Sequence, residues 1–130
     1  MAKVLVVDDD DGIRMLVQIQ LRENGHKVAV AASPDEALQL VRERGAPDIA
    51  VLDVSMPGMD GFDLMKLLRE IEGMENLPVI FLSARVDEAH VHRGRELGCT
   101  YLTKPYVASA LNSAIDSLLA AVPVAVLADW

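Results

Sequence analysis

The sequence predicts one doubly wound α/β domain, in which five parallel strands form a sheet with helices on both faces. Two observations lead to this prediction. Short apolar segments alternate along the chain with segments of helical periodicity, and the strand segments are apolar throughout rather than at every second position. Strands of this kind need cover on both faces, and helical crossovers between parallel strands provide it. The 130 residues suffice for one such domain with a single folded core.

The predicted strands are short runs rich in valine, leucine and isoleucine. In chain order they are Val4 to Val7, Val28 to Ala32, Ile49 to Leu52, Val79 to Leu82 and, more weakly, Cys99 to Leu102. Apolar residues at helical spacing follow them, most clearly from Ile13 to Leu21 and from Phe62 to Leu68. Strand and helix therefore alternate over nearly the whole chain.

Capping residues and glycines indicate where the predicted helices begin and end. The second helix is predicted most clearly, because Ser33 can cap it, Pro34 suits the first helical position and Glu36 can close a capping box. A glycine follows each of four helical segments, where the chain often needs a left-handed residue to turn back: Gly25, Gly45, Gly73 and Gly98. These breaks fit a regular repeat of strand and helix.

Composition and charge argue against several functions. The formal net charge of -8 would repel a nucleic-acid backbone and an anionic membrane surface, so we expect neither as a partner. The first apolar run is too short for a signal peptide or a membrane span, and we expect a cytoplasmic protein. The single cysteine, Cys99, cannot form an internal disulfide, and we expect a small buried thiol.

Acidic side chains follow two of the predicted strands. Asp8 and Asp9 come directly after the first strand, and Asp53 comes directly after the third. The carboxyl ends of strands form the ligand-binding edge of open α/β sheets, and carboxylates that meet there repel one another unless a cation neutralises them. Mg²⁺ prefers such oxygen ligands, so we expect these three residues to bind Mg²⁺. We interpret Asp10 and Asp11 as part of a solvated turn. Either of these two residues could cap the helix that begins near Gly12.

Two further strand ends contribute a hydroxyl and an ammonium group. Ser83 follows the fourth predicted strand, and Lys104 follows the fifth. A carboxylate nucleophile, a divalent ion, a cationic side chain and a hydroxyl donor are what phosphoryl transfer requires. Taken alone, Ser83 could cap a loop and Lys104 could be a surface lysine. Their common position at one edge of the sheet, together with Asp53, favours a site for phosphoryl transfer.

Four ordered motifs resemble those of a known family. They are VVDD at 6–9, LDVSMPGMDG at 52–61, LSA at 82–84 and TKPY at 103–106. With these motifs the chain resembles the receiver domain of response regulators, the two-component signalling proteins of the CheY-like superfamily, over about residues 3–121. The resemblance implies a flavodoxin-like sheet of strand order 2-1-3-4-5. It also implies a receiver domain at 1–121, with 122–130 as a C-terminal tail or linker stub.

The resemblance assigns roles to the residues of the motifs. Asp53 would be the phosphoacceptor. Asp8 and Asp9 would hold Mg²⁺ together with Asp53, and the backbone carbonyl of Ser55 would be a further ligand. Lys104 would pair with Asp53 or with its phosphoryl oxygens.

The resemblance also implies a conformational switch. Ser83 stands where the family has a serine or threonine that moves to bond the phosphoryl group, and Tyr101 stands where an aromatic ring swings into the vacated space. Pro105 occupies the family's cis-proline position, which would aim the preceding lysine inward. Phosphorylation, which adds about -1.5 to -2 charges, would bias a two-state equilibrium and change the face formed by the fourth helix, fifth strand and fifth helix.

The implied partners are a histidine kinase or a histidine phosphotransfer protein as donor, and a downstream target or output domain that the sequence does not identify. No enzymatic activity is expected beyond the domain's own phosphoryl transfer and autodephosphorylation. The fourth helix, around 87–97, lacks the full charge pattern of dimeric DNA-binding regulators, so a homodimer through the fourth-helix face stays open. The alternative function is a docking module that works without phosphorylation, and phosphoryl uptake on Asp53 separates the two.

Other classes of site fit the sequence less well. A phosphatase of the haloacid-dehalogenase type needs a second aspartate two residues after its nucleophile, where this chain has Ser55. An FMN site or a P-loop needs glycine, serine and threonine amides in the first loop, which is acidic here. His90 and His92 lie two residues apart in a predicted helix and point in different directions, which makes them a poor pair of metal ligands.

Overall fold

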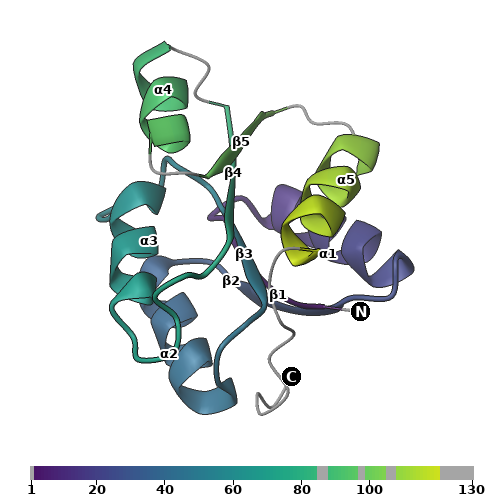
Figure 1. Ribbon diagram of the computed structural model, residues 1–130, viewed down its shortest axis with the longest axis horizontal. Helices are drawn as coiled ribbons and strands as arrows, with labels where there is room; N and C mark the ends of the chain where they lie inside the picture. The colour runs from purple at the N-terminus through teal and green to yellow at the C-terminus, as the bar shows by residue number, and fades with distance from the viewer. Residues whose placement is uncertain (1, 85–87, 97–98, 105–107, 121–130) are drawn as a thin grey trace.

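The structure, a computed structural model, describes residues 2–84, 88–96, 99–104 and 108–120. Its elements in chain order are β1 (Lys3–Val7), α1 (Asp11–Glu23), β2 (Lys27–Ala31), α2 (Pro34–Arg44), β3 (Ile49–Leu52), α3 (Gly61–Arg69), β4 (Val79–Ser83), α4 (Glu88–Glu96), β5 (Thr100–Thr103) and α5 (Ala108–Leu119). Figure 1 shows the sheet between two layers of helices. Within the described segments, no helix is long and apolar enough to cross a membrane.

The five strands form one sheet in the order β2-β1-β3-β4-β5, and every neighbouring pair is parallel. Strand β1 pairs with β2 on one side, where Val6 lies opposite Val30, and with the central strand β3 on the other, where Val6 lies opposite Val51. The predicted doubly wound α/β fold and its strand order are therefore confirmed.

Each face of the sheet has its own hydrophobic core. Leu5 and Val7 of β1 face α2 and α3, where they join a core that includes Val41, Phe62 and Leu68. The alternate β1 residues Val4 and Val6 face α1 and α5, and this second core includes Val17, Leu21, Leu111 and Ile115. Because both faces are buried, a polar side chain on a central strand would be left without solvent, which explains why the strands are apolar throughout.

The predicted strand boundaries differ from the observed ones by at most one residue. β3 has the predicted bounds, β1 and β4 are each one residue longer, β2 lies one residue earlier and β5 one residue later. The difference arises because apolar patterns report side chains, whereas strands are defined by backbone pairing. Lys27 has an exposed side chain, yet its backbone pairs with Lys3, and the backbone of the exposed Thr103 pairs with Ser83.

Most of the predicted helix ends are confirmed. Asp10 caps α1 by accepting a hydrogen bond from the Ile13 N–H at 3.0 Å, and Ser33 caps α2 by accepting from the Glu36 N–H at 3.2 Å. The predicted capping box is wrong in one detail, since the Glu36 carboxylate accepts from the Ala32 N–H at 3.4 Å, one residue before the cap. Three of the four predicted glycines have positive φ, at Gly25, Gly45 and Gly73, and Gly98 lies outside the described residues.

Gly61 fixes the loop that connects β3 to α3. Its N–H donates to the Val54 carbonyl at 2.9 Å, and a Cβ atom at this position would collide with the backbone carbonyl of Asp53. Only glycine permits this close approach of the helix start to the strand end. The packing of Gly61 therefore controls the backbone on which Asp53 lies.

We expect Gly61→Ala to lower the free energy of unfolding by about 2 to 3 kcal/mol, because the collision is with backbone atoms that cannot rotate away. Gly73→Ala is the matched control: Gly73 has φ +87° but open space around its Cβ position, so only the conformational strain of about 1 kcal/mol applies. Urea unfolding measures both changes. Equal losses in the two variants would contradict the close approach at Gly61.

Candidate functional site

A cleft of about 390 Å³ opens at the carboxyl ends of the strands. Its lining consists of strand-end residues and their neighbours, namely Asp8, Asp9, Asp10, Asp53, Ser55, Ser83, Ala84 and Lys104. All of the residues that the sequence predicts for phosphoryl transfer and metal binding are thus brought together in one place. Of the predicted site residues, Tyr101 alone is outside this lining.

The three expected metal ligands lie close together. Asp8 and Asp53 are buried, Asp9 is exposed, and one carboxylate oxygen of each lies within 4.8 Å of the other two. The sheet sets this spacing, because the Asp8 N–H donates to the Ala31 carbonyl and the Asp53 N–H donates to the Val7 carbonyl. Both aspartates therefore lie one residue beyond their strands, where backbone hydrogen bonds to the neighbouring strand still fix the position of the chain.

Lys104 is the positively charged member of the cleft. Its Nζ lies 2.6 Å from Asp8 Oδ2 and 3.5 Å from Asp53 Oδ2. The Lys104 N–H also donates to the Ser83 carbonyl at 2.8 Å, which extends the pairing of β5 with β4 beyond the strand ends. The expected pairing with Asp53 is therefore present within ion-pair distance, while the shorter contact is to Asp8.

The cleft raises the pKa of the Asp53 carboxyl from 3.8 to about 6. Burial is the largest cause, followed by repulsion from the Asp8 carboxylate and, more weakly, from Asp9. Attraction to Lys104 and the hydrogen bond from the Ser55 N–H to Asp53 Oδ1, at 3.3 Å, act in the opposite direction. One ammonium group therefore does not neutralise the carboxylates around Asp53.

The donor set of the cleft suits a hard divalent cation. Three carboxylates converge there, and their charge exceeds that of the single lysine. Asp8 Oδ1 accepts from the Asp10 N–H at 2.9 Å, which aims this carboxylate into the cleft. Oxygen ligands with surplus negative charge are what Mg²⁺ prefers, so the residues fit the expected ion.

The two expected switch residues lie on adjacent strands. Ser83 is fully buried at the end of β4. Tyr101 on β5 is half-buried and packs against the core on the α2 and α3 side, with its ring centroid 6.2 Å from that of Phe81. The roles of Ser83 and Tyr101 in switching stay predictions.

Other expectations have different outcomes. The cis-proline prediction concerns Pro105, which lies outside the described residues. The side chain of His90 is not described either, whereas His92 is exposed and its Nε2 lies 2.9 Å from Glu96 Oε1. Cys99 is buried as predicted.

Arg14 is a residue that sequence analysis missed. Its Nη1 donates to the backbone carbonyl of Asp8 at 2.8 Å, and its Nη2 pairs with Asp11. The sequence did contain a signal, because a cation near the start of a helix opposes the helix dipole and therefore needs an anionic partner. Asp10 was also underestimated, since it lines the cleft in addition to capping α1.

Comparison with known proteins places the chain in a family. A family model described as response regulator receiver domain matches residues 4–116. The chain therefore belongs to the response regulator receiver domains, the receiver modules of two-component signalling. This assignment is consistent with a part in phosphorylation-dependent signalling.

Particular relatives agree with this assignment. The chain is 40% identical over 120 residues to the transcriptional regulatory protein AfsQ1 of Streptomyces coelicolor, covering 92% of this chain and 52% of that protein. It is 34% identical to sporulation initiation phosphotransferase F of Bacillus subtilis, covering 90% and 93%. The solved receiver domain of Francisella response regulator 1452 has 36% identity and a TM-score of 0.82, covering 93% and 98%. The chain spans about half the length of the transcriptional regulators that it matches.

The raised pKa of Asp53 predicts how stability depends on pH. The folded protein binds the Asp53 proton more tightly than the unfolded chain does, so ionisation of this group costs stability as the pH rises from about 4 to about 6. Without divalent ions, we expect Asp53→Asn to raise the free energy of unfolding by about 1 to 3 kcal/mol near pH 7, and by little near pH 4.

Urea unfolding at the two pH values, with chelator present, measures this difference. Glu72→Gln is the control, because it removes the same charge at an exposed position outside the cleft. A destabilised Asp53→Asn variant at neutral pH would show that the carboxylates of the cleft do not strain the fold.

Proposed function

We propose that this domain is a phosphorylation-activated switch in which Asp53 is the phosphoacceptor. The observation that carries the proposal is the convergence of two buried aspartates, the exposed carboxylate of Asp9, one lysine and one buried serine in a single cleft. A structural cluster of buried charges is normally neutralised internally, whereas here three carboxylates lie near one lysine. The surplus negative charge instead suits an ion and a transferred group that arrive from solvent.

In the proposed reaction a carboxylate oxygen of Asp53 attacks the phosphorus of a phosphohistidine on the donor. The new O–P bond forms as the P–N bond breaks, and the imidazole nitrogen keeps the electron pair. Asp53 can act at neutral pH because its pKa, although raised to about 6, leaves most of the group ionised. Hydrolysis of the resulting acyl phosphate by water would return the aspartate and release inorganic phosphate.

Asp8, Asp9 and Asp53, with the backbone carbonyl of Ser55, would hold Mg²⁺. When bound, the ion supplies positive charge that screens the carboxylates and the phosphoryl oxygens from one another. Lys104 lies where its ammonium could neutralise a further phosphoryl oxygen, since its Nζ is 3.5 Å from Asp53 Oδ2. Its role would be to stabilise charge on the transferred group.

The buried hydroxyl of Ser83 would move to bond a phosphoryl oxygen, and Tyr101 would move inward as space opens beside it. Phosphorylation adds about -1.5 to -2 charges, which biases a pre-existing equilibrium between two conformations rather than creating a new one. The face formed by α4, β5 and α5 would present the change to a downstream target, to an output domain or to a second copy of the chain.

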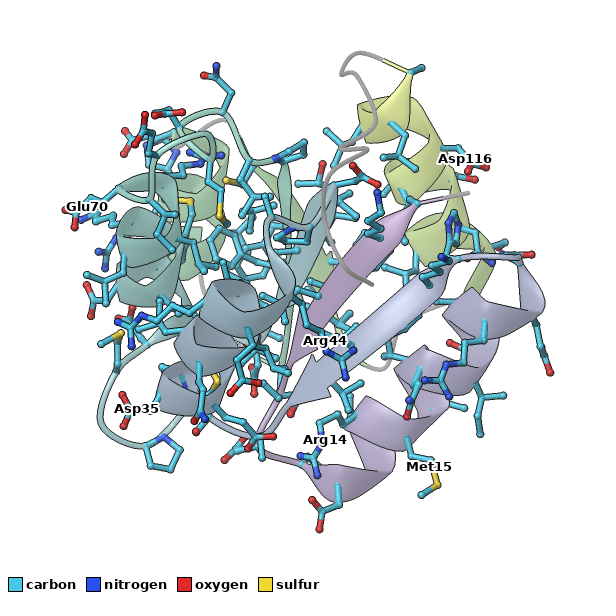
Figure 2. The ribbon with its side chains drawn as sticks, turned by 90° about the horizontal axis from the view of Figure 1, so that it is seen from below. Arg14, Met15, Asp35, Arg44, Glu70 and Asp116 are labelled. Carbon is cyan, nitrogen blue, oxygen red and sulfur yellow. The ribbon has the colours of Figure 1, made fainter. Side chains whose placement is uncertain are left out.

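The phosphodonor would be a histidine kinase or a histidine phosphotransfer protein that docks on α1. Three large apolar side chains of this helix, Met15, Leu16 and Ile19, are exposed by 63%, 46% and 48%. Figure 2 shows Met15 pointing away from the body of the protein. The helix begins at Asp11, beside the cleft, so a partner bound to these side chains could also reach Asp53. Clustered exposed apolar side chains are typical of protein interfaces.

The alternative is a receiver fold that docks its partners without phosphorylation. It would need no metal and no reactive Asp53, and the chemical completeness of the cleft therefore favours the switch. Phosphoryl uptake distinguishes the two.

With Mg²⁺ and acetyl phosphate, we expect the wild-type protein to gain the mass of one phosphoryl group. Asp53→Asn should gain none, and the wild type should gain none when the metal is chelated. Intact-mass spectrometry measures the adduct, and Asp63→Asn, at an exposed position of α3, is the control for loss of an aspartate elsewhere. A folded wild type without adduct would leave only the docking module.

We expect Ile19→Ser to slow phosphoryl transfer from any purified histidine kinase or phosphotransfer protein that phosphorylates the wild type, by about tenfold for a loss of 1.4 kcal/mol. Phosphorylation by acetyl phosphate, which needs no docking surface, should be unchanged. Glu72→Gln is the matched surface control. Equal slowing with both donors would place the effect in the cleft instead of the docking surface.

A further inference from the structure

Helix α4 has little apolar surface with which to hold its position. Among its described side chains Val91 is half-buried, whereas Ala89, His92, Arg93 and Glu96 are exposed. A helix that packs on a domain normally carries a continuous apolar stripe. In Figure 1, α4 stands at the end of the molecule beyond α3, and it packs mainly against β5. A contact other than ordinary burial must therefore contribute to its placement.

Arg93 makes such a contact. Although the residue is exposed, its guanidinium carbon lies 4.5 Å from the centroid of the Phe62 ring, which is fully buried in the first turn of α3. A cation over the face of an aromatic ring at this distance is attracted by the ring quadrupole. The guanidinium thus joins α4 to α3.

The Phe62 ring belongs to a row of three aromatic rings, the last of which is the expected switch residue Tyr101. The centroid of the Phe62 ring lies 4.7 Å from that of Phe81 on β4, and Phe81 lies 6.2 Å from Tyr101 on β5. Such tilted pairs at these distances interact favourably. Phe81 is also two residues before Ser83 on the same strand and the same face of the sheet. Phe81 therefore lies between the Tyr101 ring and the Phe62 ring that Arg93 contacts, and a displacement of Tyr101 could reach Phe62 through it.

We propose that Arg93 is a latch that holds α4 in the position of this structure, that this position is the one favoured before phosphorylation, and that the latch couples it to the Tyr101 ring. The coupling to phosphorylation rests on the proposed function, whereas the latch itself does not. Arg93 touches no reacting atom and is a positioning residue. A contact that exists in only one of two conformations shifts their ratio by its own free energy, so loss of the latch favours the other conformation. For a partly exposed cation–π contact this shift is about two- to fivefold.

The first experiment tests the latch in the metal-free, unphosphorylated protein. We expect Arg93→Gln, which keeps much of the side-chain length but loses the charge, to speed hydrogen exchange of the α4 backbone amides about two- to fivefold. Arg93→Lys should retain part of the protection, because it keeps a cation. His92→Gln is the control on the same helix, since it changes the contact between His92 and Glu96 and leaves Arg93 and Phe62 in place.

A double-mutant cycle with Phe62→Leu separates the latch from a general loosening of α4. The leucine keeps the core apolar but removes the ring, so Arg93→Gln should have no further effect in this background. The latch is overturned if Arg93→Gln leaves exchange unchanged, if His92→Gln has the same effect, or if the effect persists without the Phe62 ring.

The second experiment tests the coupling. With Mg²⁺ and beryllofluoride as a phosphoryl mimic, we expect Arg93→Gln to bind the mimic two- to fivefold more tightly than the wild type and to shift the NMR signal of the Tyr101 ring. Unchanged affinity and an unchanged Tyr101 signal, when the wild type binds normally, overturn the coupling. Absence of binding by the wild type itself overturns the proposed function, and the exchange cycle then decides the latch alone.

Discussion

The functional geometry of this domain depends on the parallel pairing of β1 with β3. Parallel strands end at the same edge of a sheet, and these two are neighbours at its centre. Asp8 and Asp53 each follow their strand by one residue, so their carboxylates meet at a distance that the backbone pairing sets. An antiparallel arrangement of the same two strands would place the carboxylates at opposite edges. The cleft is thus a consequence of topology before it is a consequence of side-chain contacts.

The same geometry makes the cleft electrostatically unfavourable for the folded state. Burial and the neighbouring carboxylates raise the pKa of Asp53, and Lys104 is shared between Asp8 and Asp53. The two apolar cores, one on each face of the sheet, supply the stability that offsets this cost. The ends of the strands therefore serve function, whereas the two faces of the sheet supply stability. Such a division is common where a functional site lowers the stability of the fold.

The sequence predicts most of the fold and the composition of the cleft for a physical reason. Strand ends can be recognised from apolar runs, and in a parallel sheet all of their carboxyl ends meet, so the presence of Asp53, Ser83 and Lys104 in one cleft follows from their positions in the chain. The sequence does not predict which carboxylate lies closest to the Lys104 ammonium group. The shorter contact of Lys104 with Asp8 depends on the conformations of both side chains, and the pattern of apolar residues carries no information about these conformations.

Contacts that long side chains make between elements were harder still to predict. Arg14 binds the Asp8 carbonyl from the start of α1, and Arg93 reaches from α4 to Phe62 on α3. Both depend on long, flexible side chains that cross between elements. In the sequence Arg93 looks like an ordinary solvated residue, and only the charge of Arg14 near the start of a helix indicates a partner.

The division of the core into two parts has a consequence for optical spectroscopy. Among the described residues, the aromatic rings of Phe62, Phe81 and Tyr101 all belong to the α2 and α3 side of the sheet, and the α1 and α5 side is purely aliphatic. The contributions of Phe62, Phe81 and Tyr101 to the near-ultraviolet circular dichroism therefore report on the α2 and α3 side of the sheet. A rearrangement beside Tyr101 alters the chiral surroundings of these rings and therefore their circular dichroism. A partner that binds to α1 contacts the other side of the sheet and leaves this signal almost unchanged.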